Sequence, residues 1–263
     1  MTTRIEHPAA RRQSRDISPS TSHRSADDWS IRRPSSTAGL GLLLMSVLAG
    51  WSVFVAVNGL VTVGNPTQTA QDILASAWLF RLGIAALVVV VALDVIVACA
   101  LYRVFSPVNR ALSMVAAALR LVYAGVFLVA VAQLSGVLRV LTDENRAVFG
   151  ADQVNAQALL SLAAFSDIWF VGQFLFGLHL LAEGYLAYRS GYVPRVLGAL
   201  LAVAGLGYAV DSLGSVLSQG PWTPVSSFTF LGELLLALWL LIRARSIAGS
   251  AAVQNAADVT IRV

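Results

Sequence analysis

Long hydrophobic runs alternate with short polar segments along this chain, and the runs define the predicted elements. None of the runs shows the strict alternation of apolar and polar residues that is typical of strands in a membrane barrel. About 20 apolar residues, each rising ~1.5 Å, are enough for a helix to cross a bilayer. The pattern therefore predicts six membrane-spanning helices at residues 38–61, 82–102, 111–138, 160–188, 195–218 and 225–243.

The fold class that follows is an all-α, polytopic membrane helix bundle, with six transmembrane helices over residues 38–245. Residues 1–37 are rich in Ser, Arg and Pro and have few large apolar side chains. We therefore expect them, and the short tail at 246–263, to be disordered. The first apolar run starts too late and is too long for a cleaved signal peptide, which indicates a retained first helix.

The charge distribution predicts how the bundle is oriented. All 18 basic residues are arginine, and seven of them lie in residues 1–37. Other arginines flank the turns after the second and fourth runs and the end of the sixth, and the opposite loops have fewer and carry acidic residues. The excess of arginine on one side predicts that both termini are cytoplasmic in the inner (plasma) membrane of a bacterial cell. The arginines that mark this side are Arg103, Arg110, Arg189, Arg195, Arg243 and Arg245.

The composition supports a membrane protein and excludes several functions. Charged residues make up 12% of the chain, about half of the ~25% typical of soluble domains, and the mean hydropathy is +0.74. Without lysine there is no Schiff base and no phosphate-loop lysine. The single cysteine, Cys99, excludes an intramolecular disulfide. The expected partner is the lipid bilayer, with no nucleic acid, no cofactor and no metal, and the sequence identifies no protein partner.

Four ionisable residues are predicted to share one depth inside the membrane. Asp94 lies nine residues from Arg103, and three others lie ten residues from an arginine at the same side. At ~1.5 Å per residue all four lie about 14–15 Å inside that edge, near mid-membrane. We call them the polar layer, and we take them as a hypothetical small-ligand or proton site: Asp94, Arg120, His179 and Glu233.

The polar layer leads to specific expectations about contacts. Asp94 and Arg120 lie on adjacent predicted helices, so we expect them to form an ion pair. His179 should lie near Asp94, Arg120 or Glu233, because we expect helix four to face the bundle interior with the side that carries this residue. Glu183 is one turn further along the same face and is expected to reach an arginine of the turns, such as Arg103 or Arg110. Two further residues are secondary candidates, namely Glu183 and, in the outer half of the membrane, Asp211.

The sequence leaves two functions open. One is binding or transport of a small ligand or proton through the layer, and the alternative is a non-catalytic structural or regulatory membrane subunit. Enzyme templates fit poorly, because the chain has neither an H-E-x-x-H motif nor a G-x-S-x-G elbow. An arginine in the layer would also repel a metal ion. We therefore assign no catalytic and no metal-binding residue.

Several motifs resemble a family of bacterial membrane proteins known as domain of unknown function 4386. The motifs are F-R-L-G at 80–83, A-x-x-R-L-x-x-A at 117–124, G-L-H at 177–179, S-G-Y-x-P-R-x-L-G at 190–198 and G-E-L at 232–234. The resemblance spans about 38–245 and implies a multi-helix membrane protein with no assigned activity. It marks as family-like Arg81, Asp94, Arg120, His179, Arg195, Asp211 and Glu233. Glu183 departs from the pattern, where an apolar residue is usual.

Overall fold

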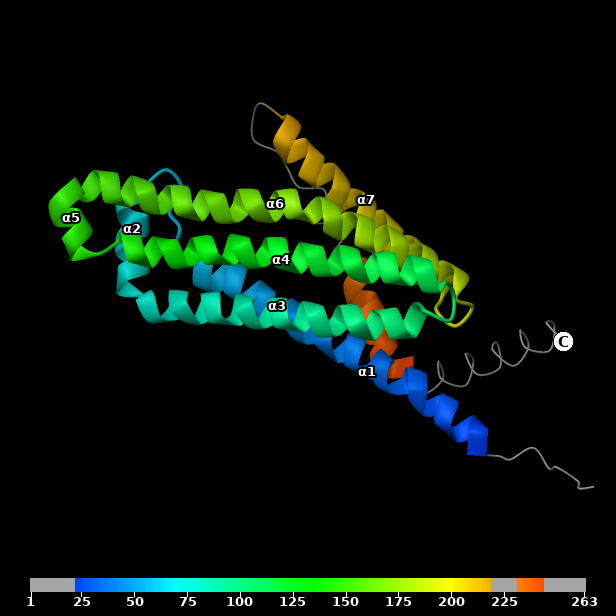
Figure 1. Cartoon of the computed structure of the whole chain (residues 1–263). Coiled ribbons are helices and arrows are strands. Elements are labelled where there is room, and N and C mark those ends of the chain that lie inside the picture. Colours follow the sequence, from blue (N-terminus) through cyan, green and yellow to red (C-terminus); the bar gives the residue numbers. More distant parts are fainter. Residues whose placement is uncertain (1–21, 219–230, 244–263) are drawn as a thin grey trace, which may run out of the picture.

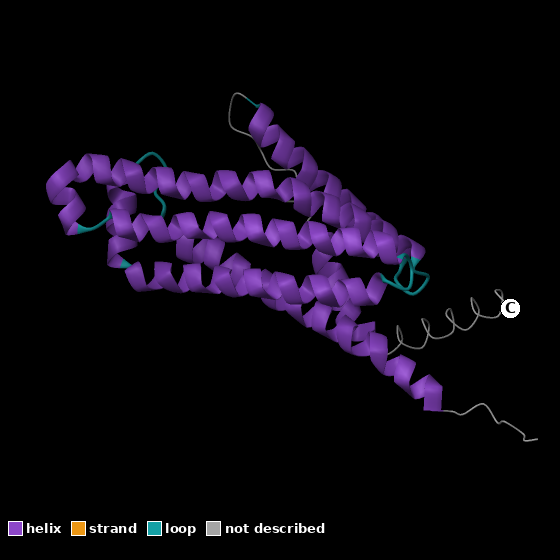
Figure 2. Ribbon diagram, viewed as in Figure 1, coloured by secondary structure: helices purple, strands orange, loops and turns teal. Residues whose placement is uncertain are grey.

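The computed structural model describes residues 22–218 and 231–243, and every regular element in these ranges is a helix (Figure 2). This confirms the all-α class. The elements are α1 (Ser22–Trp51), a π-helix η1 (Ser52–Val57), a short 3₁₀ helix η2 (Asn58–Leu60), α2 (Pro66–Ala75), α3 (Ala77–Phe105), α4 (Arg110–Val140), α5 (Asp143–Phe149), α6 (Ala151–Arg189), α7 (Arg195–Leu217) and an unlabelled helix at 231–243.

Five helical segments are long and apolar enough to cross a membrane, and they coincide with the first five predicted spans. They are Arg33–Leu60, Ala77–Phe105, Arg110–Val140, Ala151–Arg189 and Arg195–Leu217. The sixth predicted span is described only in part, as the helix at 231–243, so it stays a prediction. The chain is therefore a multi-pass membrane protein with five candidate spans among the described residues.

The predicted tails and loops agree less closely with the structure than the predicted spans do. Helix α1 begins at Ser22 and includes Pro34, so it starts inside the segment for which we predicted disorder. Residues 1–21 and 246–263 lie outside the described ranges, so the predicted tails stay predictions there. The loops also contain two helices that the hydrophobic pattern did not predict, α2 and α5, whose first turns are capped by the side chains of Asn65 and Thr142.

The long helices α3, α4 and α6 lie side by side, and α1 crosses them at an angle (Figure 1). Helix α4 packs against both α3 and α6, α1 packs against α3, and α7 packs against α6. The helix at 231–243 fits between α1 and α7. A Cβ built on Gly39 would meet Leu241, and one built on Gly232 would meet Leu200. Five helices and this last segment thus surround one interior.

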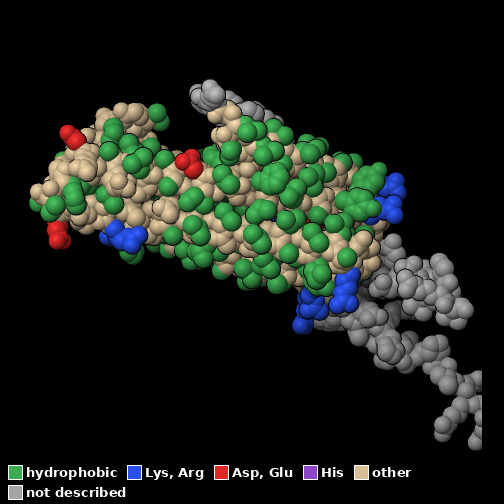
Figure 3. All heavy atoms as spheres, turned by 45° about the horizontal axis from the view of Figure 1, so that its top comes forward, with side chains coloured by type: hydrophobic (Ala, Val, Ile, Leu, Met, Phe, Trp, Pro, Cys, Tyr) green, Lys and Arg blue, Asp and Glu red, His purple; other side chains and the backbone are tan. Residues whose placement is uncertain are grey.

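Arginines gather at one end of the molecule. The α3–α4 and α6–α7 turns both lie there, and blue side chains mark it in Figure 3. We call this the arginine-rich end, and its turns carry Arg103, Arg110, Arg189 and Arg195. The Tyr192 hydroxyl ties the two turns together by donating a 2.7 Å hydrogen bond to the Val104 carbonyl. The opposite end holds α2 and α5 (Figure 1).

Helices α6 and α7 touch backbone to backbone through glycines. A Cβ added to Gly177 would lie 2.6 Å from the carbonyl oxygen of Gly205, and one added to Gly184 would lie 2.7 Å from that of Gly198. Such distances leave no room for a side chain, so these four positions set the helix separation. Small residues allow helices to approach closely in lipid, where little hydrophobic force drives them together. The glycines on the facing sides of α6 and α7 therefore serve helix packing.

Candidate ligand-binding site

One buried arginine collects contacts from four other segments of the chain. The Arg120 guanidinium on α4 is 1% exposed, and its Nε donates a 2.8 Å hydrogen bond to Asp94 Oδ1 on α3. Its Nη1 lies 3.1 Å from His179 Nε2 on α6. Glu233 Oε1, on the last described helix, accepts from Nη1 at 3.4 Å and from Nη2 at 3.5 Å. The predicted Asp94–Arg120 ion pair is confirmed. The other two residues of the polar layer, His179 and Glu233, also contact Arg120.

The guanidinium of Arg120 is saturated. An arginine side chain has five N–H bonds and no acceptor. The fifth contact is a weak one from Nη2 to the Met45 sulfur on α1, at 4.0 Å. The two carboxylates are not held equally, because Asp94 is 2% exposed and closely bonded, while Glu233 is 20% exposed and more distant. Glu233 is thus the more weakly held and the more exposed of the two carboxylate partners.

The contacts of His179 fix its protonation state and its tautomer. The ring is fully buried, and its Nδ1 lies 2.9 Å from the Ala116 carbonyl oxygen. A carbonyl only accepts, so Nδ1 carries a hydrogen and donates it. Arg120 only donates, so Nε2 accepts and has no hydrogen. His179 is therefore a neutral imidazole that links α6 to α4, and the expectation that it lies near the layer is confirmed.

Glu183 does not lie where the sequence placed it. Its side chain is 2% exposed, and neither carboxyl oxygen has a hydrogen-bond partner among the described residues. The expected pairing with Arg103 or Arg110 is wrong, because both arginines are exposed at the ends of their helices. Long basic side chains at such positions reach toward water rather than back into the bundle. Glu183 instead borders a small cavity that Arg120 also lines.

The remaining candidates lie apart from Arg120. Asp211 is fully buried on α7 but does not line the cavity that Glu183 borders. Arg81 is exposed, and so is Arg195, whose guanidinium stacks over the Tyr188 ring at 5.7 Å. The structure thus brings together four of the six candidates in direct contact and places Glu183 beside them. That these residues bind a ligand stays a prediction.

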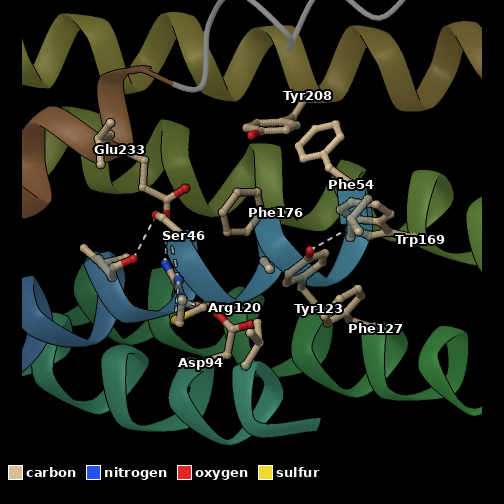
Figure 4. A pocket seen from close by; sticks show the side chains of 17 residues that line it. Ser46, Phe54, Asp94, Arg120, Tyr123, Phe127, Trp169, Phe176, Tyr208 and Glu233 are labelled. Atoms are coloured by element: carbon tan, nitrogen blue, oxygen red, sulfur yellow. Dashed lines mark hydrogen bonds and ion pairs between the residues drawn. The ribbon is translucent and has the colours of Figure 1, made fainter. Parts of the chain in front are cut away.

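A pocket of about 320 Å³ is lined at one end by Asp94, Arg120 and Glu233, which we call the cluster. It lies between α1, with its π-helix, and the facing surfaces of α3, α4, α6, α7 and the last described helix. Figure 4 shows that its two ends differ in chemistry. The polar end holds Ser46, Asp94, Arg120 and Glu233, and the aromatic end holds Phe54, Tyr123, Phe127, Trp169 and Tyr208, with Phe176 between them.

The aromatic rings pack on one another and on the cluster. The Arg120 guanidinium lies over the Phe176 ring, 5.4 Å from its centroid. Tyr123 and Phe176 have centroids 4.8 Å apart, and the Trp169 indole N–H donates to the Tyr123 hydroxyl at 3.0 Å. Buried aromatic rings with satisfied polar groups hold their orientation. These contacts therefore hold the rings in fixed orientations along the pocket wall.

The sequence did not identify the aromatic wall, although its rings share helix faces with residues of the polar layer. On α4, Tyr123 and Phe127 follow Arg120 by three and seven residues. On α6, Phe176 precedes His179 by three residues. Residues three, four and seven apart share one helix face, so each ring lies on the face that carries a layer residue.

The π-helix η1 forms part of the pocket wall on the side of the first span. It interrupts the first span over Ser52–Val57 and supplies Val53 and Phe54 to the lining. Gly83 on α3 allows close contact there, because a Cβ at that position would lie 2.6 Å from that of Ala56. The wider turn of a π-helix re-aims side chains and is frequent at functional sites. A hydrophobic pattern alone does not reveal it.

The site combines an arginine, two carboxyl groups and an imidazole with a set of aromatic rings. Among residues 22–218 and 231–243, no group of three or more His, Cys, Asp or Glu side chains is arranged to hold a metal ion. The nearby imidazole is engaged on both nitrogens. The pocket combines a partly exposed carboxylate, Glu233, at its polar end with several ring faces at its other end.

Comparison with known proteins gives a family but no activity. The model of a family described as "Domain of unknown function (DUF4386)" matches residues 37–244. An uncharacterized protein of Archaeoglobus fulgidus is 34% identical over 158 residues, which cover 60% of this chain and 81% of the relative. That organism is an archaeon, and the bacterial origin of this chain stays a prediction. No solved structure matches the chain.

Proposed function

We propose, on the premise that this chain belongs to the DUF4386 family of unknown function, that the protein binds a small, largely apolar ligand that carries a positive charge. The observation that carries the proposal is the 320 Å³ pocket with an accessible carboxylate, Glu233, at one end and an aromatic wall at the other. Pockets of this size and mixed character are typical of small-ligand sites.

The charge balance at the polar end favours a cation. Arg120 is neutralised by Asp94 at 2.8 Å, so Glu233 is a second carboxylate on a guanidinium that is already paired. With both carboxyl groups ionised, the cluster has one negative charge in excess. A buried excess charge is costly in a membrane, and a cation beside Glu233 compensates it.

The aromatic wall favours the same class of ligand. The faces of Trp, Tyr and Phe rings attract cations, with about 0.5–2 kcal/mol per contact. Arg120 over Phe176 is an instance inside the site itself. The other rings, at the far end of the pocket, suit an apolar or aromatic body. An organic amine or quaternary ammonium compound with an apolar group combines both requirements.

A matched pair of probes tests the proposal. Benzyltrimethylammonium and its neutral carbon isostere, neopentylbenzene, have the same shape and differ in charge. We expect the cation to raise the unfolding temperature of the purified protein and the neutral isostere to have a smaller effect. Glu233→Gln should weaken the cation roughly 10- to 150-fold, the loss expected for a contact to a charged group. Glu144→Gln, on the exposed first turn of α5, is the control.

Two results would contradict the proposal. Equal stabilisation by the two probes, or equal affinity for the cation in the wild type and Glu233→Gln, would show that the carboxylate recognises no charge. If no probe of any charge binds, and layer substitutions only lower stability, the alternative of a non-catalytic structural or regulatory subunit is favoured.

We also propose that the helix at 231–243 completes a sixth span and that both termini are cytoplasmic, in the inner (plasma) membrane of a bacterial cell. Support comes from the placement of two turns and their arginines at one end of the bundle. A reporter that is active only outside the cytoplasm, fused after Arg245, should be silent, and one fused near Asn145 should be active. The reverse pattern would refute the orientation.

A further inference from the structure

The small cavity behind Arg120 holds an ionisable group that the proposed function does not use. It measures about 10 Å³ and is lined by Arg120, His179, Glu183 and Glu233 among leucine side chains. A volume of about 10–15 Å³ is the least that holds one water molecule. Both oxygens of Glu183 are buried at this cavity without a hydrogen-bond partner among the described residues.

The surroundings of Glu183 do not support a negative charge on it in the resting state. The N–H groups of Arg120 are directed to other partners, two of them carboxylates. His179 is neutral and engaged at both nitrogens. An ionised Glu233 would place a second negative charge on the same cavity, and Tyr192 is the further titratable group within electrostatic range. The lining from α1, α3 and α7 is apolar, namely Leu42, Leu101 and Leu201.

We propose that Glu183 is a proton-binding site, and that the protein releases this proton when a cation occupies the neighbouring pocket. In the resting state the side chain is a neutral carboxylic acid. When a cation pairs with the Glu233 carboxylate, it neutralises the negative charge that lies on the same cavity as Glu183. Glu183 then gives up its proton through the cavity, and the new carboxylate replaces Glu233 beside the guanidinium.

The charges balance in this step. One cation enters the pocket and pairs with Glu233. One O–H bond of Glu183 breaks, and one proton leaves the protein. No oxidant or second substrate is needed. The result is the exchange of one proton for one organic cation at a shared arginine, so the coupling rests on the proposed function, whereas the resting proton on Glu183 does not.

Infrared spectroscopy tests the resting proton without any ligand. At neutral pH, the full-length wild type should show a protonated carboxyl band that Glu183→Gln lacks and Glu144→Gln retains. An amide fits the same space, and Glu183→Leu is a second variant if the glutamine form does not fold. A wild-type spectrum that matches that of Glu183→Gln in this region would overturn the proton site, whatever the pocket binds.

Proton release tests the coupling, with benzyltrimethylammonium as the probe in weakly buffered nanodiscs and a pH-indicating dye. The wild type should release about one proton per bound cation, and its affinity should rise up to about tenfold per unit of pH, by linkage. Glu183→Gln should bind the probe but release none and lose the pH dependence. Equal release by Glu183→Gln and wild type would overturn the coupling, whereas absence of binding by the wild type would contradict the proposed function alone.

Discussion

The contact between Asp94 and Arg120 makes a sharp prediction about stability. We consider two single substitutions, Asp94→Asn and Arg120→Gln, and their combination. Asparagine keeps the volume of Asp94 and one acceptor for Arg120 Nε, so it removes charge and little else. Glutamine removes the guanidinium and its contacts, and leaves the Asp94 carboxylate buried without its cation.

The expected magnitudes follow from burial and distance. Arg120 and Asp94 are 1% and 2% exposed and 2.8 Å apart, so neither charge is relieved by solvent. Asp94→Asn should cost about 1–1.5 kcal/mol, the difference between a hydrogen bond to a charged acceptor and one to a neutral acceptor, because the bond is kept and Glu233 still balances Arg120. Arg120→Gln should cost about 3–5 kcal/mol, since it leaves a buried charge uncompensated.

The double variant is the decisive measurement. With both charges removed, it should be less destabilised than the sum of the single variants, by roughly 0.5–3 kcal/mol. Reversible unfolding by SDS in mixed micelles, followed by tryptophan fluorescence, gives the three free energies. Additive losses would refute the reasoning, because they would mean that the two charges do not depend on each other.

Three further predictions concern packing. Gly184→Leu should lower the unfolding free energy by about 1–3 kcal/mol or more, since its side chain would meet the Gly198 backbone. Gly125→Ala should not lower it, because a Cβ at that position meets nothing within 4 Å. Equal effects of the two variants in the same SDS titration would contradict direct helix contact. Tyr192→Phe should cost about 0.5–1.5 kcal/mol through loss of its bond to Val104, and an unchanged midpoint would show that the bond does not stabilise the turns. His179→Gln should be milder than His179→Ala in thermal unfolding, because a glutamine oxygen can still accept from Arg120.

The polar layer could be predicted because depth follows directly from counting residues along a helix. Asp94, Arg120, His179 and Glu233 lie nine or ten residues from arginines at the same end, and their side chains meet. Glu183 shows where this reasoning fails. Counting placed it closer to the turns, but whether Arg103 and Arg110 turn inward depends on solvation at the helix ends, which spacing does not give.

The pocket could not be predicted from the sequence for a related reason. An aromatic residue in an apolar run looks the same whether it packs in the core or faces a cavity. Phe176 and Tyr123 became recognisable as pocket residues only once the helices that carry them were placed around α1. The π-helix at Ser52–Val57 has no signature in the hydrophobic pattern either. The spans therefore follow from local composition, whereas the site depends on how the spans pack.

The placement of the ion pair on successive helices has a consequence for biogenesis. Asp94 leaves the ribosome 26 residues before Arg120, on the preceding helix. The α3–α4 hairpin can therefore enter the bilayer with its guanidinium already matched, avoiding part of the ~2.5–3.5 kcal/mol that each isolated charge costs on insertion. Glu233 follows Arg120 by 113 residues and arrives at a partner that is already neutralised. The order of synthesis thus leaves the last carboxylate as the one least committed to the protein itself.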